Sequence, residues 1–150
     1  MSVTIKNLEA AFAGESQAHV KYRYFAKLAR EQGFEDVAKH FEHTAEQEVK
    51  HAWGHLELLV GKPDVKTCLQ KAIDGETYEN TEMYPNMLKE AIAEGDELTA
   101  KEAQHQIEES VEHAEEFKKV LETAAKRFKA LQNAEKVHAS NYQKMKEEIA

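Results

Sequence analysis

The sequence predicts an all-α protein built as a four-helix bundle. Gly and Pro are scarce, at six and two of 150 residues, and they divide the chain into long segments. Within these segments apolar residues recur at intervals of three and four, as they do on the buried face of a helix. No segment shows the apolar–polar alternation of a strand or the turn signal of a β-hairpin.

The first two helices have clear stop signals. We expect the first over about residues 7–32, starting at an Asn that can serve as N-cap and ending at Gly33. The second runs over about residues 34–60 and is closed by Gly61 and Pro63.

The last two helices are longer. We expect the third over about residues 64–94, bent at Pro85 and ended by Gly95. The remainder of the chain contains neither Gly nor Pro, which predicts an extended or inserted helical segment before or within the fourth helix.

Composition restricts the partners and the compartment. A length of 150 residues predicts one domain, residues 1–150. The net charge of −8 argues against nucleic acid or an anionic membrane as partner. Cys68 is the single cysteine, and no apolar run has the length of a signal core or a membrane span. We therefore expect a cytoplasmic protein.

Two short patterns each occur twice, and together they indicate a metal site. Gly-Glu-Ser (residues 14–16) and Gly-Glu-Thr (residues 75–77) each place a Glu on a helix. Glu-x-x-His occurs at residues 48–51 and 135–138, a spacing that puts carboxylate and imidazole on one helix face. A Glu from each of two helices plus Glu-x-x-His from each of two others is the ligand set of a two-metal site inside a four-helix bundle.

Glu79, one turn after Glu76, adds a further carboxylate. Five carboxylates and two neutral imidazoles would nearly cancel the charge of two divalent cations. Tyr22 and Tyr84 lie about two turns after the Glu of each Gly-Glu pattern, so each either packs in the core or hydrogen-bonds a ligand carboxylate. The candidate metal ligands are Glu15, Glu48, His51, Glu76, Glu79, Glu135 and His138.

The second half of the chain departs from the register of the first. In the first half, the His of Glu-x-x-His lies 18 residues after the Gly that ends the preceding helix. The same step from Gly95 reaches His113, but the residue three positions earlier is Ser110. The intact Glu135-x-x-His pair lies 25 residues later, about seven helical turns, so it keeps the same face.

Two arrangements fit this spacing. In one, residues 96–123 form a helical insertion, a protruding hairpin that brings Glu135 and His138 level with the site. In the other, His113 takes the ligand place with Ser110 beside it, on a straight helix. We favour the insertion, because Ser cannot replace a bridging carboxylate at neutral pH. An exchange of helices between two chains would satisfy the same geometry.

The chain resembles the rubrerythrin family. The likeness covers about residues 7–95 and again about 124–147. It implies a ferritin-like bundle whose di-iron site reduces hydrogen peroxide to water in oxidative-stress defence. The segments that carry it are 11–18 (AFAGESQA), 74–79 (DGETYE), 81–85 (TEMYP) and 134–139 (AEKVHA).

The resemblance also implies a role for each ligand of the first iron and of the bridge. Glu15 and Glu79 would be terminal ligands of one iron, and Glu48 and Glu135 would bridge. His51 would bind that iron when it is reduced and give way to Glu79 when it is oxidised. The cofactor implied is a pair of iron ions, Fe²⁺ or Fe³⁺, oxo- or hydroxo-bridged when oxidised.

Glu76 and His138 would complete the second iron, and the two tyrosines would hydrogen-bond ligand carboxylates. The rubredoxin-like domain with its four cysteines has no counterpart here, which implies the shorter erythrin type and an external electron donor such as a rubredoxin. The family further suggests a homodimer, with or without exchanged helices.

Two other functions share these observations. A ferroxidase or iron-handling protein would use the same site with oxygen as oxidant. A metal-free helical interaction module would carry its Glu and His residues as surface decoration.

Overall fold

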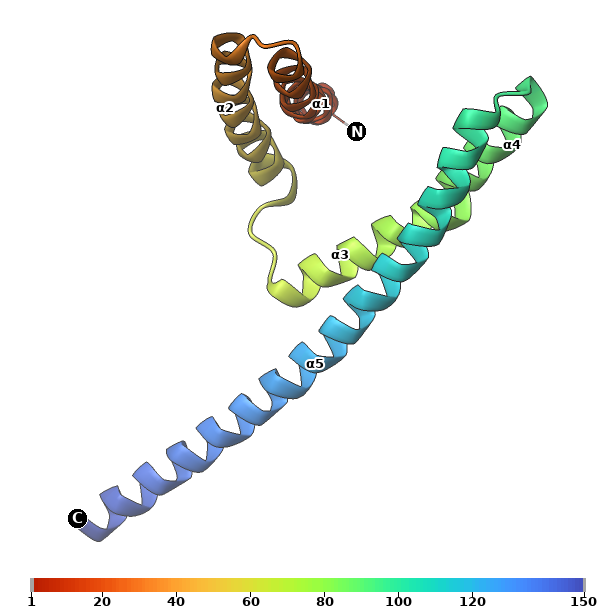
Figure 1. Cartoon of the computed structure of the whole chain (residues 1–150). Helices are drawn as coiled ribbons and strands as arrows, with labels where there is room; N and C mark the ends of the chain where they lie inside the picture. Colours follow the sequence, from red (N-terminus) through yellow and green to blue (C-terminus); the bar gives the residue numbers. More distant parts are fainter. Residues whose placement is uncertain (1, 150) are drawn as a thin grey trace. The chain divides into compact units, whose positions relative to one another are not determined.

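The computed structural model describes residues 2–149, and all regular structure within that range is helical (Figure 1). The predicted all-α class is confirmed. The chain divides between Pro63 and Asp64 into two compact units. Among the helices of the described range, none is long and apolar enough to cross a membrane.

The first unit is a hairpin of α1 (Val3–Glu31) and α2 (Glu35–Val60). The α1 helix begins one turn earlier than the expected Asn7, because the Ser2 hydroxyl accepts a hydrogen bond from the amide of the third helical residue at 3.3 Å. Gly33, with φ at 84°, makes the turn between the helices, a conformation that residues with a Cβ rarely adopt.

Alanines form the buried core of this hairpin. On α2 they recur every seven residues, which places them along one stripe of the helix surface. Their small side chains let the two helix backbones approach closely. The buried residues of the first unit are Ala26, Ala38, Ala45 and Ala52.

The second unit begins with three helical segments in succession: α3 (Val65–Tyr78), the π-helix η1 (Glu79–Met83) and α4 (Tyr84–Glu94). The expected bend near Pro85 is therefore a widened turn that precedes the proline. Because Pro85 has no amide hydrogen to donate, the preceding helical ladder is interrupted there. The Tyr84 amide donates to the carbonyl of Glu79, five residues back.

A tight turn joins α4 to the long helix α5 (Glu97–Ile149). Gly95 adopts the left-handed conformation, with φ 73° and ψ 20°. Asp96 then accepts hydrogen bonds from the backbone amide and the hydroxyl of Thr99, at 3.0 and 2.6 Å. The α3, η1 and α4 segments pack along the first half of α5. The buried residues of this unit are Ile73, Ala91, Ala103, Ser110 and Ala114.

The second half of α5 has no covering segment in its own unit, and every described residue from 125 to 149 is exposed. The expected extension of the fourth helix is thus present. It continues α5 outward, whereas the favoured arrangement placed an insertion, residues 96–123, in a protruding hairpin. The turn lies at Gly95, and α5 runs without a break from there.

Candidate metal centre

Glu15, Glu48 and His51 form a cluster in the first unit. Glu15 comes from α1 and the other two from α2, one turn apart on the same face. One ligand atom of each residue lies within 4.8 Å of the others. The Nδ1 atom of His51 is 3.8 Å from Oε2 of Glu15 and 3.5 Å from Oε2 of Glu48. The structure thus brings together three of the ligands expected from the sequence.

The electrostatics of this cluster suit a bound cation. The carboxyl of Glu48 is 18% exposed, and its pKa is raised, first by its hydrogen bond with the carboxyl of Glu15 and then by burial. Two carboxylates at this separation repel each other unless they share a proton or bind a positive ion. Carboxylate oxygen and imidazole nitrogen are also donors that iron accepts.

His19 holds the two helices together next to this cluster. Its Nδ1–H donates to the carbonyl of Ala45 at 2.8 Å. His19 lies one turn after Glu15 on α1, and Ala45 lies one turn before Glu48 on α2. The sequence offered one signal for this role, the i, i+4 spacing from Glu15.

The second unit contains a second cluster, made of Glu76, Glu79, Ser110 and His113. The Nδ1 atom of His113 lies 3.4 Å from Oε2 of Glu76. The hydroxyl of Ser110 donates to Oε2 of Glu79 at 3.2 Å. Asn80 completes the contact between the two sides of this hairpin, because its amide donates to the carbonyls of Glu76 at 2.8 Å and Ser110 at 3.5 Å.

One atom of this cluster lacks a partner. Oε2 of Glu76 is buried and makes no hydrogen bond to any described residue. Its 3.4 Å distance to His113 allows electrostatic attraction but lacks hydrogen-bond geometry. A buried carboxylate oxygen without a donor is costly, and a bound cation would supply the missing partner. The residues of this cluster therefore fit a metal ion.

The two tyrosines differ in their surroundings. Burial raises the pKa of Tyr84, and the nearby carboxylates, first Glu79, raise it further. Its hydroxyl stays protonated at neutral pH and can donate a hydrogen bond toward that cluster. The ring of Tyr22 lies 6.0 Å from that of Phe41 and 6.5 Å from that of Phe25, centroid to centroid, which favours core packing.

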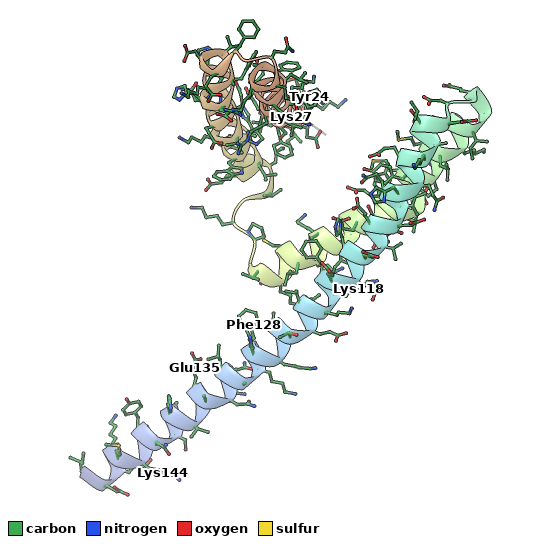
Figure 2. The ribbon with its side chains drawn as sticks, in the orientation of Figure 1. Tyr24, Lys27, Lys118, Phe128, Glu135 and Lys144 are labelled. Carbon is green, nitrogen blue, oxygen red and sulfur yellow. The ribbon has the colours of Figure 1, made fainter. Side chains whose placement is uncertain are left out.

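Glu135 and His138 are not brought to Glu76. Both lie on the exposed half of α5, where Figure 2 shows Glu135 well beyond the part of the helix that α3 covers. Helix geometry places Glu135 about 33 Å along the axis from His113. Because the turn at Gly95 joins two continuous helical arms, residues at equal distances from it pair.

The fold and these clusters define a class: an all-α protein made of helix hairpins, each carrying carboxylate and histidine ligands for a metal. The comparisons with known proteins identify the family. The Rubrerythrin family model matches residues 6–121, and the chain belongs to this family. The match runs through residues 96–121 and ends before Glu135. The family and the ferritin-like, all-α fold class expected from the sequence are confirmed.

Curated relatives share between a third and two fifths of the aligned residues. Nigerythrin of Nitratidesulfovibrio vulgaris (strain Hildenborough) is 41% identical over 106 residues, 61% of this chain and 52% of that protein. Rubrerythrin of the same organism is 38% identical over 129 residues, 77% of this chain and 65% of that protein. The chain thus spans about half to two thirds of these relatives.

Among solved structures, "Fully reduced state of nigerythrin (all ferrous)" aligns with a TM-score of 0.42 and 32% identity. The alignment covers 83% of this chain and 69% of that one.

Proposed function

We propose that this protein is a di-iron oxidoreductase of oxidative-stress defence that reduces hydrogen peroxide to water. The observation that carries the proposal is the cluster of Glu15, Glu48 and His51, whose ligand atoms lie within 4.8 Å of one another. Family membership supports iron as the metal. The buried, unpaired oxygen of Glu76 supports a cation at the second cluster as well.

The ligand set that the geometry favours differs in one helix from the set expected from the sequence. His113 replaces His138, and no carboxylate replaces Glu135, because Ser110 occupies the corresponding place. Four carboxylates and two neutral histidines then balance the four positive charges of two ferrous ions. The proposed ligands are Glu15, Glu48, His51, Glu76, Glu79 and His113.

When bound, a ferrous pair supplies the two electrons that break the O–O bond of peroxide, and two protons complete two water molecules. The protein's own residues hold and orient the ligands. His19 fixes α1 against α2 beside Glu15, and Ser110 fixes the carboxylate of Glu79. Tyr84 keeps its proton and offers a donor beside the second cluster.

The electrons must come from a donor. A four-thiolate iron site needs four cysteines, and the 150 residues contain one. An external donor protein such as a rubredoxin meets this need. A single cysteine also suits a reducing compartment such as the cytoplasm.

The test is iron content and visible absorption of anaerobically reconstituted protein, before and after one equivalent of hydrogen peroxide or oxygen. We expect two irons per chain and a ferric absorption band that forms faster with peroxide. Faster oxidation by oxygen would indicate a ferroxidase instead. Protein without bound iron would exclude both activities and leave a helical interaction module.

A pair of variants on α2 makes this test specific. Glu48→Ala removes a carboxylate of the first cluster and should abolish binding of a second iron. Glu46→Ala removes an exposed carboxylate that pairs with Arg23 at 3.2 Å, and iron content should be unchanged. Two irons per chain in Glu48→Ala would contradict the ligand assignment.

A further inference from the structure

The exposed half of α5 continues the helix face that is covered in the first half. In the first half, residues that alternate at three and four positions are buried or half-buried against α3, η1 and α4: Ala103, Ile107, Ser110, Ala114, Phe117 and Leu121. The same spacing then continues through Ala124, Phe128, Leu131, Tyr142, Met145 and Ile149. Phe128 and Leu131 are 54% and 62% exposed, and Figure 2 shows Phe128 on the uncovered part of α5.

This spacing is the heptad pattern of a coiled-coil seam. It passes unbroken from a contact inside the chain to a stretch that no segment of the same unit covers. Two polar residues interrupt it, Glu135 and His138, at the middle of the exposed stretch. A seam needs a partner helix, and the position of these two residues determines which partner fits.

Two copies of this seam match when the helices run antiparallel. In an antiparallel pair, each residue at one seam position faces a residue at the other, and the two residue numbers have a constant sum. If Glu135 faces His138 of the other copy, Leu131 faces Tyr142, Phe128 faces Met145 and Ala124 faces Ile149. Every remaining layer is apolar, and the smallest side chain lies opposite a large one.

Other pairings are unfavourable. A shift of one heptad would place Glu135 against Leu131 or Met145 and bury a carboxylate without a polar partner. A parallel, in-register pair would place Glu135 against its own copy, two like charges at the seam. A single polar layer that specifies register and orientation is a known feature of coiled coils.

The flanking positions agree with the antiparallel register. Next to the seam, Arg127 of one copy lies on the same side as Glu148 of the other, about two residues apart along the axis. These charges attract. Lys146 is level with Ala125 of the other copy, so no like charges meet along residues 124–149.

We propose that the exposed half of α5, residues 124–149, is a self-association surface on which a second copy of this chain binds antiparallel, with Glu135 and His138 as its central polar layer. This assigns a role to the second Glu-x-x-His motif outside the metal ligands. The proposal stands on the seam alone and does not require iron.

Disulfide mapping of iron-free, full-length protein tests the register. Leu131→Cys and Tyr142→Cys are made in separate chains, each with Cys68→Ser, and one chain carries a mass tag. We expect a cross-linked heterodimer when the two are mixed. Leu131→Cys alone should not cross-link, because its copies lie about 16 Å apart along the axis, beyond the reach of a disulfide. A cross-link of Leu131→Cys to itself, or none in the mixture, would overturn the proposal.

Sedimentation of two matched charge variants tests the surface itself. Leu131→Lys places a charge on the seam, and Asn133→Lys places the same charge on the outer face of α5. We expect at least a tenfold weaker association for Leu131→Lys only, with helicity by circular dichroism unchanged in both. Equal association of the two variants would contradict the proposal, whatever their iron content.

Discussion

Oε2 of Glu76 and Nδ1 of His113 lie 3.4 Å apart across a hairpin, 19 residues before Gly95 and 18 residues after it. The first unit repeats this relationship. Glu15 and His51 lie 3.8 Å apart, each 18 residues from Gly33. Each unit therefore presents a carboxylate and an imidazole at the same distance from a glycine turn. This repeat supports His113 as the counterpart of His51.

The first prediction separates the two candidate histidines of α5. His113→Ala should lower iron content from two to one or fewer per chain, because it removes the imidazole beside Glu76. His138→Ala makes the same truncation on the exposed half of α5 and should leave iron content unchanged. Iron and protein assays after anaerobic reconstitution measure both. Loss of iron from His138→Ala alone would restore the ligand set expected from the sequence.

The second prediction concerns the buried hydroxyl of Ser110. Ser110→Glu adds a carboxylate beside Glu79 in a buried place, which should destabilise iron-free protein by about 3 kcal/mol, the scale of an uncompensated buried charge. Iron should restore part of this loss. Ser110→Gln has similar volume without the charge, so iron should not rescue it. Denaturant unfolding with and without ferrous iron compares them, and equal responses to iron would refute the prediction.

The third prediction uses two glycines in different conformations. Gly95→Ala should lower the free energy of unfolding by about 1–2 kcal/mol, because Gly95 is left-handed with φ at 73°. Gly54→Ala lies inside α2, where an added Cβ meets nothing within 4 Å, and should raise it by up to about 1 kcal/mol. Urea unfolding measures both. Stabilisation by Gly95→Ala would be incompatible with the observed turn.

The fourth prediction concerns pH and the start of α5. Hydrogen bonds from the hydroxyl and then the amide of Thr99 lower the pKa of Asp96 below its ordinary value of 3.8. Because the folded-state pKa is lowered, the stabilisation is complete above pH 3.8 and is lost as pH falls through the lower folded-state value. Asp96→Asn keeps a hydrogen-bond acceptor but does not titrate.

Unfolding of wild type and Asp96→Asn between pH 2 and pH 6 checks this expectation. Other carboxylates titrate in both proteins, so the relevant quantity is the difference between their free energies of unfolding. The advantage of the wild type should shrink on acidification below about pH 4. A difference that stays constant over the whole range would show that Asp96 does not stabilise the helix start through its charge.

Much of the fold followed from local signals. Gly33 and Gly95 are turns with positive φ, and the i, i+3 spacing of Glu48 and His51 brought both to Glu15. The second half was harder, because two signals disagreed. Motif chemistry favoured Glu135, whereas distance from Gly95 favoured His113, and the geometry of two unbroken helices decided for the latter.

Two other features had no clear signal in the sequence. The π-helix of residues 79–83 depends on how the ladder before Pro85 rearranges, which the proline alone does not specify. Gly14 and Gly75 suggested close helix contacts, yet an added Cβ at either would meet nothing within 4 Å. Within the described structure, helix contact does not require these two glycines.

The π-helix that begins at Glu79 gives this carboxylate a freedom that its neighbours lack. A π turn holds one residue more than an α turn. The extra residue can move along the helix by exchanging one backbone hydrogen bond at a time, without unfolding either end. Each exchange turns one side chain about 100° around the axis. Glu79 is thus the carboxylate that the backbone can swing, while Glu76 stays on regular α-helix one turn away.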